Sequence, residues 1–337
     1  MSKRPKSGGK KKKEEDSVEE LEKLKRIQNA KDIKFKYVFA CARYVTEPIS
    51  TIIKKLDDSI NSGKEFNQII INHPKLFAND IVAMDIGFRL TELKMIRIWK
   101  CQLLFQTLDL LVEMIINRPT IKGIDLIGCS FAKSNEISLF TLASKMKNIT
   151  ILVLDYTILG DHASHIFHGL ISNSNCCLIT LSMRYCHINS KVSLDYIGKF
   201  LTACQTITYL DLGGNLIKDE GLKEITKSIE TIKSLKSLNL SFNEIEVIGP
   251  SAFTQLCYAI GSNHTLTHVN LTGNFFNEMA FQTILQALEL RKGLVLSKLA
   301  PPLELLVSER VNNVLYEKIH NLNIFLASKA TTGKKKK

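Results

Sequence analysis

The chain has 337 residues, 45% of them hydrophobic, which is enough to build a large buried core. No apolar run approaches the roughly 18 residues of a membrane span, and no apolar stretch follows the basic N-terminus, so we expect neither a membrane span nor a secretory signal. A formal net charge of +12 points to a polyanionic partner until that charge is located along the chain.

The positive charge lies almost entirely at the two ends. Residues 1–13 contain seven Lys or Arg and no acid, and residues 334–337 are four lysines. Residues 14–333 carry 34 of the 45 basic residues against all 33 acidic ones, so the body of the chain is nearly neutral. The eight cysteines follow no spacing typical of a disulfide framework or a zinc site, so we expect free thiols in a reducing cytosol or nucleus.

The first 63 residues predict a basic tail followed by a cap. Residues 1–14 are of low complexity, which predicts a disordered tail. Residues 15–63 predict an N-terminal cap that covers the first unit of a repeat array. A helix is expected to begin near Ser17, because Ser17-Val-Glu-Glu20 is a capping-box pattern.

Two further elements are expected inside this cap. Apolar residues alternate with lysines between Asp32 and Ala40, which favours a strand, although the helical pattern of the neighbouring residues leaves a helix open. Thr46-Glu47-Pro48 is a typical helix start, and this second helix is expected to run to about Ile60 and to end by Gly63.

An eleven-residue frame recurs through residues 64–296. Its clearest copy, Leu235–Ile245, reads Leu-x-x-Leu-x-Leu-x-x-Asn-x-Ile, and a degenerate copy lies at Phe66–Leu76. The frame begins, at spacings of 28 to 31 residues, at Leu93, Ile121, Ile149, Leu178, Ile207, Leu235 and Leu266. This period is the signature of a solenoid, in which stacked units bury apolar faces that a single unit cannot bury alone.

Each unit predicts a short strand, a turn and a helix. Between the frames, apolar residues recur at helical spacing, as at Leu222, Ile225 and Ile229. A unit of about 28 residues has room for a full helix on the outer side. We therefore predict an α/β solenoid, a curved horseshoe with a parallel inner β-sheet, outer helices, and helical N- and C-terminal caps.

The ninth position of the frame carries either asparagine or cysteine in six copies. Asparagine there can hydrogen-bond the backbone of the adjacent turn and form a ladder, and cysteine fits the same buried slot with less polar demand. We expect a structural role, not metal or redox chemistry, at Cys101, Cys129, Cys186, Asn215, Asn243 and Asn274.

The array is expected to end near residue 296. Leu294–Leu296 predicts a last partial strand, after which Pro301-Pro302 breaks the chain. Apolar residues at near-helical spacing between Val307 and Leu322 predict a closing helix. The expected divisions are a tail at 1–14, a cap at 15–63, the solenoid at 64–296, a helical cap at 297–328 and a basic tail at 329–337.

Over roughly residues 66–290, the frame and its period resemble the ribonuclease-inhibitor type of leucine-rich repeat. The resemblance implies a horseshoe with helices outside. Proteins of this type include ribonuclease inhibitor, Ran GTPase activators, tropomodulin-like actin cappers, innate immune sensors and several axonemal proteins of cilia. One fold thus carries many functions, so the resemblance implies no partner by itself. The lysine-rich ends make the chain similar to short proteins of this type in ciliary axonemes.

The sequence contains no motif that carries a known reaction. It lacks Gly-x-x-x-x-Gly-Lys-Ser/Thr, Gly-x-Ser-x-Gly and His-Glu-x-x-His. His162, His165 and His168 fan over about 120° of a predicted helix. We interpret them as solvated side chains, with a metal site as the alternative. The prediction is a protein that is not an enzyme and that needs no cofactor or metal.

A candidate partner site lies on the inner face of the predicted sheet. Side chains alternate along a strand, so the third, fifth and seventh frame positions point to the concave face, and the eighth lies at its rim. The N-terminal and middle units carry Trp, Tyr and Arg there, which are enriched at binding hot spots. The alternative is that these side chains only fill the inner curve. The predicted partner-binding residues are Arg97, Trp99, Lys100, Asp155, Tyr156, Arg184, Tyr185 and Asp211.

The basic ends are a second candidate interaction region. They would attract a polyanion such as acidic tubulin tails, nucleic acid or an anionic membrane, and the alternative is a solvated tail. They contain no aromatic residue, so no sequence-specific nucleic-acid binding is expected. The predicted polyanion-binding residues are Lys10, Lys11, Lys12, Lys13, Lys334, Lys335, Lys336 and Lys337.

Two functions follow from these features. The first is a non-enzymatic scaffold that binds proteins on its concave face, as a structural component of a cytoskeletal assembly such as the ciliary axoneme, with tubulin or another acidic filament bound through the tails. The second is a soluble regulator of a GTPase or another enzyme, in the cytoplasm or the nucleus. The first function predicts a cytoplasmic protein on the cytoskeleton or axoneme, and the second leaves the nucleus open.

Overall fold

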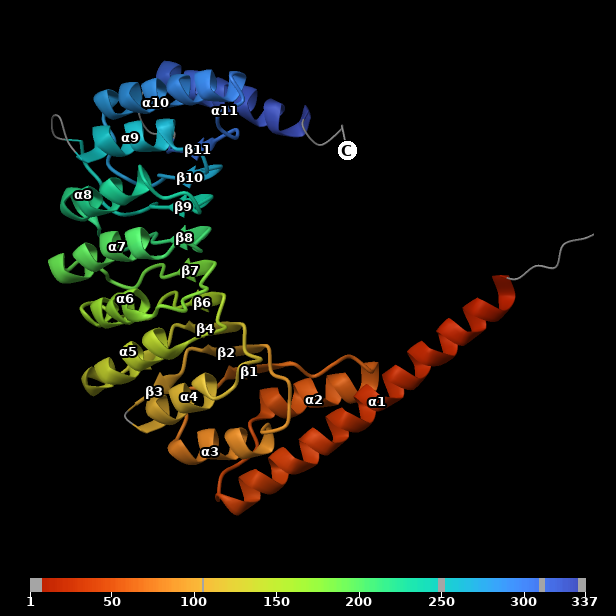
Figure 1. The fold of residues 1–337 in the computed structure, drawn as a ribbon. Coiled ribbons are helices and arrows are strands. Elements are labelled where there is room, and N and C mark those ends of the chain that lie inside the picture. Colours follow the sequence, from red (N-terminus) through yellow and green to blue (C-terminus); the bar gives the residue numbers. More distant parts are fainter. Residues whose placement is uncertain (1–7, 105, 248–251, 309–312, 333–337) are drawn as a thin grey trace, which may run out of the picture.

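The computed structural model describes residues 8–104, 106–247, 252–308 and 313–332. Within these residues, nine parallel strands lie side by side in chain order and form one sheet (Figure 1). They are β1 (Gln68–Asn72), β2 (Met95–Trp99), β4 (Gly123–Ile127), β6 (Ile151–Val153), β7 (Thr180–Ser182), β8 (Tyr209–Asp211), β9 (Ser237–Asn239), β10 (His268–Asn270) and β11 (Glu304–Leu306). Two short strands, β3 (Gln102–Leu103) and β5 (Ser130–Phe131), pair separately.

One helix follows each strand of the main sheet and lies on its outer side (Figure 1). These helices are α3 (Ala78–Gly87), α4 (Gln106–Ile116), α5 (Glu136–Lys145), α6 (His162–Ser172), α7 (Lys191–Ala203), α8 (Lys218–Ile229), α9 (Ala252–Ser262), α10 (Glu278–Leu296) and α11 (Asn313–Thr332). Two helices precede the sheet, α1 (Gly8–Arg43) and α2 (Ser50–Ser62). The predicted α/β solenoid with a parallel inner sheet and outer helices is therefore confirmed.

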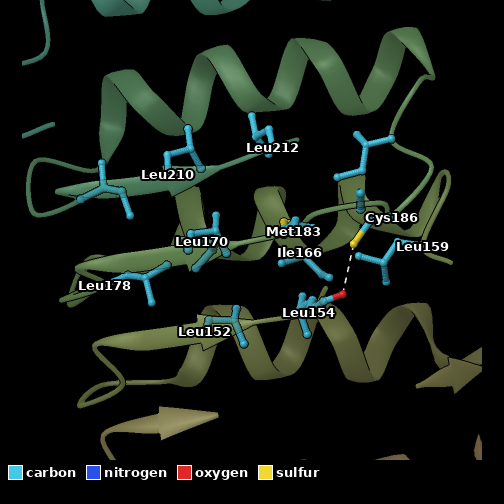
Figure 2. Packing of buried hydrophobic residues seen from close by; sticks show 14 of the residues in the cluster. Leu152, Leu154, Leu159, Ile166, Leu170, Leu178, Met183, Cys186, Leu210 and Leu212 are labelled. Carbon is cyan, nitrogen blue, oxygen red and sulfur yellow. Dashed lines mark hydrogen bonds between the residues drawn. The ribbon is translucent and has the colours of Figure 1, made fainter. Parts of the chain in front are cut away.

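The core lies between the strands and the helices because the frame places apolar side chains at equivalent positions in every unit. Leu181 of β7 pairs in register with Leu210 of β8, and both are fully buried. Ile166 and Leu170 of α6 pack toward these strands (Figure 2). Stacking in this way continues from one unit to the next, so the apolar interior runs the length of the array.

Asparagine at the ninth frame position links neighbouring units, as predicted. The amide oxygen of Asn215 accepts the backbone N–H of Cys186 at 2.9 Å, and its amide nitrogen donates to the carbonyl of Met183 at 2.6 Å. Cysteine reproduces the second contact only, since the Cys186 thiol donates to the carbonyl of Leu154 at 3.1 Å (Figure 2). Burial raises the pKa of this thiol to about 12, as expected for a structural cysteine.

The N-terminal region differs from the sequence prediction in two ways. Helix α1 already begins at Gly8, so the prediction of disorder is wrong for residues 8–14, while residues 1–7 lie outside the described residues. The predicted strand at Asp32–Ala40 is also wrong, because this segment continues α1. Its buried residues, Ile33, Tyr37 and Ala40, follow a helical period.

Helices α1, α2 and α3 pack together at this end. The Tyr37 ring of α1 stacks on Phe88 with centroids 5.0 Å apart, and its hydroxyl accepts the backbone N–H of Ile49 at 3.0 Å. A Cβ on Gly87 of α3 would lie 2.7 Å from the Tyr37 Cα, so only glycine allows this approach. The predicted second helix is confirmed as α2, and Gly63 ends it with a φ of 69°.

The C-terminal end also differs from the prediction. Leu294–Leu296 form the last turn of α10 and not a strand. The last strand of the sheet is β11, which follows Pro301-Pro302 and pairs with β10. The sheet therefore continues beyond residue 296 into the segment expected to form the C-terminal cap. The predicted closing helix is present as α11, and it extends to Thr332, past the expected start of the basic tail at residue 329.

Candidate partner-binding face

The strand register brings the fifth frame positions into one row across the concave face. Arg97 of β2 lies beside Asp125 of β4, and Ser182 of β7 lies beside Asp211 of β8. Polar side chains separated by a full unit in sequence are thereby placed on neighbouring strands. This row forms the floor of the face.

Arg97 and Asp125 form an ion pair on this floor, with Nε and Oδ2 3.1 Å apart. The carboxylate is the more buried partner. Its burial raises the pKa of Asp125, while the positive charge of Arg97 opposes that rise. Arg97 keeps about a third of its side chain exposed, so it remains available at the surface of the face.

The carboxylates of Asp155 and Asp211 make hydrogen bonds and ionic contacts within the face, and both lie next to Arg184. The Asp155 carboxylate accepts the Ser182 hydroxyl at 2.7 Å and the backbone N–H of Arg184 at 3.0 Å. Asp211 is 2% exposed and accepts Asn239 at 2.9 Å, and its Oδ2 lies 3.8 Å from the Arg184 Nε. Both carboxylates were predicted as partner-binding residues, but their contacts orient neighbouring groups.

Burial and the Asp211 carboxylate also raise the pKa of the neighbouring Tyr209. The Tyr209 hydroxyl donates to Asp211 Oδ2 at 3.1 Å. Desolvation, followed by the negative charge of Asp211, raises the pKa of Tyr209 to about 12. The floor around Arg184 is therefore a connected polar network whose groups are held in fixed positions.

Trp99 and Lys100 lie at the end of β2, the second strand of the sheet. Trp99 is the last residue of β2 and is half-buried, and the backbone N–H of the exposed Lys100 donates to the Ile127 carbonyl at 2.8 Å. The Trp99 indole N–H is occluded and has no hydrogen-bond partner among the described residues. A buried donor without an acceptor costs free energy, which a contacting carbonyl would recover.

The eighth frame positions form the rim, where the backbone is left-handed. The φ angles are 58° at Tyr156, 52° at Tyr185 and 73° at Gly214. The rings of Tyr156 and Tyr185 stack with centroids 5.1 Å apart, and the Arg184 guanidinium lies 5.8 Å from the Tyr185 centroid. A Cβ on Gly214 would lie 2.3 Å from the Tyr185 ring, so glycine is required beneath this tyrosine.

The same arrangement recurs in the C-terminal half. The Phe242 ring lies over Gly273, where a Cβ would be 2.3 Å away. Phe242 and Phe275 are 51% and 58% exposed, and they line a hollow of about 520 Å³ that also contains Ser308. We call Tyr156, Tyr185, Phe242 and Phe275 the aromatic rim. The sequence prediction missed its second half, although Phe242 already stood at an eighth position.

The histidine cluster lies on helix α6 and does not belong to this face. His162 and His165 lie 3.4 and 3.5 Å from Glu136, and the His168 ring contacts Phe140 and Tyr196 at 5.2 Å each. Across the described residues, no group of three His, Cys, Asp or Glu side chains could hold a metal ion.

The eight predicted tail lysines are only partly covered by the structure. Lys10, Lys11, Lys12 and Lys13 lie in the backbone of the first turns of α1, and Lys334, Lys335, Lys336 and Lys337 fall outside the described residues. None of the helices in the described ranges is long and apolar enough to cross a bilayer.

Comparisons with known proteins agree with the repeat pattern. Two family models, both described as leucine-rich repeats, match residues 203–225 and 234–256. The human NACHT, LRR and PYD domains-containing protein 14 is 31% identical over 101 residues, which cover 30% of this chain and 8% of that protein. Human NACHT, LRR and PYD domains-containing protein 13 is 30% identical over 119 residues, covering 35% and 11%.

These relatives are much longer than the matched segment. The mouse NACHT, LRR and PYD domains-containing protein 14 is 22% identical over 183 residues, which cover 53% of this chain and 18% of that protein. Among solved structures, the chain is similar to Leiomodin-1 Actin-Binding Site 2, with a TM-score of 0.42 and 16% identity, over 50% of this chain and 94% of that one. The chain thus matches less than a fifth of each of these relatives' own length.

Proposed function

The chain is a leucine-rich repeat protein, and we propose that its concave face and aromatic rim bind a protein partner without catalysing a reaction. Proteins built from these repeats act as interaction modules. The observation that carries the proposal is the aromatic rim itself. The exposed Tyr156 ring stacks on the half-buried Tyr185, which contacts Arg184, over a floor of fixed hydrogen bonds. Such rigid aromatic and arginine groups lose little entropy on binding.

We further propose that this scaffold belongs to a cytoskeletal assembly such as the ciliary axoneme. The support is the location of the net charge, because the two ends hold eleven basic residues and the rest of the chain is almost neutral. Lysine-rich ends would attract an acidic filament, such as one covered by tubulin tails, while the concave face contacts a second protein.

A quantitative capture experiment tests the face. We expect combining Trp99→Ala, Arg184→Ala and Tyr185→Ala to lower the recovery of at least one protein from a ciliated-cell extract by about tenfold or more. Val192→Ala, at an exposed apolar residue on the outer helix α7, should leave recovery unchanged. Thermal unfolding checks that each variant is folded. Equal recovery of every protein by the triple variant and the wild type would refute binding at this face.

Co-sedimentation with microtubules assembled from purified tubulin tests the tails. Replacing Lys10–Lys13 and Lys334–Lys337 by glutamine keeps the length of the chain and removes eight positive charges. We expect binding that weakens with salt and is lost in the glutamine variant. Absence of binding by the wild type at low salt would exclude tubulin as the acidic partner and would leave the face untouched.

A further inference from the structure

Helix α1 carries a second apolar face that no other described part of the chain covers. The helix packs against α2 and α3 through Ala30, Ile33, Tyr37 and Ala40. Its N-terminal part stands away from the solenoid (Figure 1). Large apolar side chains remain exposed on it, and they are Val18, Leu21, Leu24, Phe35, Val38 and Phe39.

The exposed side chains gather on one side of the helix. At about 100° per residue, Leu21, Leu24 and Phe35 fall within an arc of roughly 60°, and Phe39 lies in the same arc. That arc is opposite the buried side of α1. Leu24 and Phe35 are 58% and 73% exposed, and the rings of Phe35 and Phe39 lie 6.4 Å apart. Within the described residues, folding of one chain therefore leaves this apolar stripe exposed to water.

The stripe has the heptad spacing of a helix pair. Its a positions are Leu21, Gln28, Phe35 and Ala42, and its d positions are Leu24, Lys31 and Val38. We propose that α1 pairs in antiparallel orientation with α1 of a second copy of this chain. The inference is independent of the proposed partner-binding face, which lies on the sheet.

One antiparallel register satisfies the whole stripe. It places Leu21 against Val38 of the second copy and Leu24 against Phe35 of the second copy. At the centre, Gln28 meets Lys31 of the second copy, where an ammonium group can donate to an amide oxygen. The leucine, valine and phenylalanine side chains at these positions thus meet apolar ones, Gln28 and Lys31 meet each other, and Ala42 meets Ser17 at the two ends.

The flanking positions agree with this register, and a core position disfavours the parallel one. Lys25 lies beside Asp32 of the second copy, twice across the two-fold axis, and Val18 lies beside Phe39 of the second copy. A parallel pair would place Lys31 against Lys31, and like charges at a d position are unfavourable. The charge pattern therefore selects an antiparallel second copy.

The stripe is long enough for a specific contact. From Val18 to Phe39 the overlap is 22 residues, or about 33 Å of helix. Covering six exposed apolar side chains in each of two copies removes on the order of 1,000 Å² from water, which is near the lower limit for a specific interface. A weak, concentration-dependent dimer is therefore expected.

Sedimentation velocity of the full chain over a concentration series tests the proposal. We expect a monomer–dimer equilibrium, and we expect Leu24→Asp combined with Phe35→Asp to raise the dimer dissociation constant about 100-fold or more. Val45→Asp combined with Leu90→Asp is the matched control, because both residues are more exposed and lie outside the stripe. A wild type that stays monomeric, or a dimer that persists in the stripe variant, would overturn the proposal.

A charge exchange tests the register. Lys25→Glu places two carboxylates side by side and is expected to weaken dimerisation about tenfold, and adding Asp32→Lys should restore it. Failure of the second substitution to restore the dimer refutes the antiparallel register. If the chain stays monomeric and its stripe binds a helix of a different protein, that protein and not a second copy is the partner of the stripe. Circular dichroism confirms that α1 remains helical in every variant.

Discussion

The two halves of the solenoid place different side chains in the same buried slot. In the C-terminal half, Asn243 accepts the backbone N–H of Asn215 at 2.9 Å and donates to the carbonyl of Leu212 at 3.0 Å. In the N-terminal half, Cys129 donates to the carbonyl of Ile98 at 3.3 Å through a weak S–H group. The asparagine half is therefore linked by strong amide hydrogen bonds, and the cysteine half depends more on apolar packing.

A unit that lies between two cysteine units, those of Cys129 and Cys186, shows an intermediate solution. Thr157 occupies the ninth position there and is fully buried. Its hydroxyl accepts the backbone N–H of Cys129 at 3.2 Å and donates to the carbonyl of Leu126 at 2.7 Å. One hydroxyl thus makes the same two kinds of contact as an asparagine amide. Cysteine, threonine and asparagine each supply a hydrogen-bond donor at the ninth position. Only threonine and asparagine also supply an acceptor for the backbone N–H of the preceding unit.

The largest expected effect separates the two halves directly. We expect Asn243→Ala to lower the free energy of unfolding by about 3 kcal/mol, because it leaves buried backbone groups unpaired on both sides. Cys129→Ala should cost only about 1 kcal/mol, since it removes a weak donor and little volume. Urea unfolding followed by circular dichroism measures both. Equal losses would show that the asparagine ladder contributes no more than apolar packing.

An intermediate effect is expected at Thr157. Thr157→Val keeps the shape of the side chain and removes both hydrogen bonds, so we expect a loss of about 2 kcal/mol in the free energy of unfolding. Thr157→Ser keeps the hydroxyl and serves as the control, and it should cost roughly half as much or less. Should valine prove harmless, the hydroxyl would not be part of the ladder.

The repeat core could be predicted from the sequence because apolar period alone decides which side chains are buried. Leu178, Leu181 and Met183 occupy the first, fourth and sixth frame positions, and all are fully buried. The choice between strand and helix at Asp32–Ala40 is harder to predict from the sequence than the repeat core. Its residues alternate over a short stretch, and the exposed rings of Phe35 and Phe39 lengthen the apparent alternation.

Parts of the candidate site depend on contacts between units, which no single unit contains. The sequence placed Tyr185 at the rim, but only stacking shows that its ring lies over Gly214 of the following unit. The sequence also treated Asp211 as a surface group, whereas its contacts with Asn239 and Tyr209 place it beneath Arg184. Register across the sheet sets these contacts, so they follow from the fold and not from the motif.

The smallest expected effect appears only in alkali. Burial raises the pKa of the Cys186 thiol to about 12, from an ordinary value of roughly 9, so the folded state keeps its proton where the unfolded state loses it. Stability from this thiol is full below about pH 9 and is lost as pH rises toward 12. The deficit of Cys186→Ala relative to the wild type should therefore shrink by on the order of 1 kcal/mol between about pH 8 and pH 10.

Asn243→Ala is the matched control for this pH dependence, because an amide does not titrate and its deficit should stay constant over the same range. Other buried groups, such as Tyr209 with its raised pKa, are present in the wild type and in both variants, so their contributions cancel. Urea unfolding at several pH values measures the two deficits. A Cys186→Ala deficit that does not change with pH would mean that the thiol is solvated and that the N-terminal half is less tightly packed than its burial indicates.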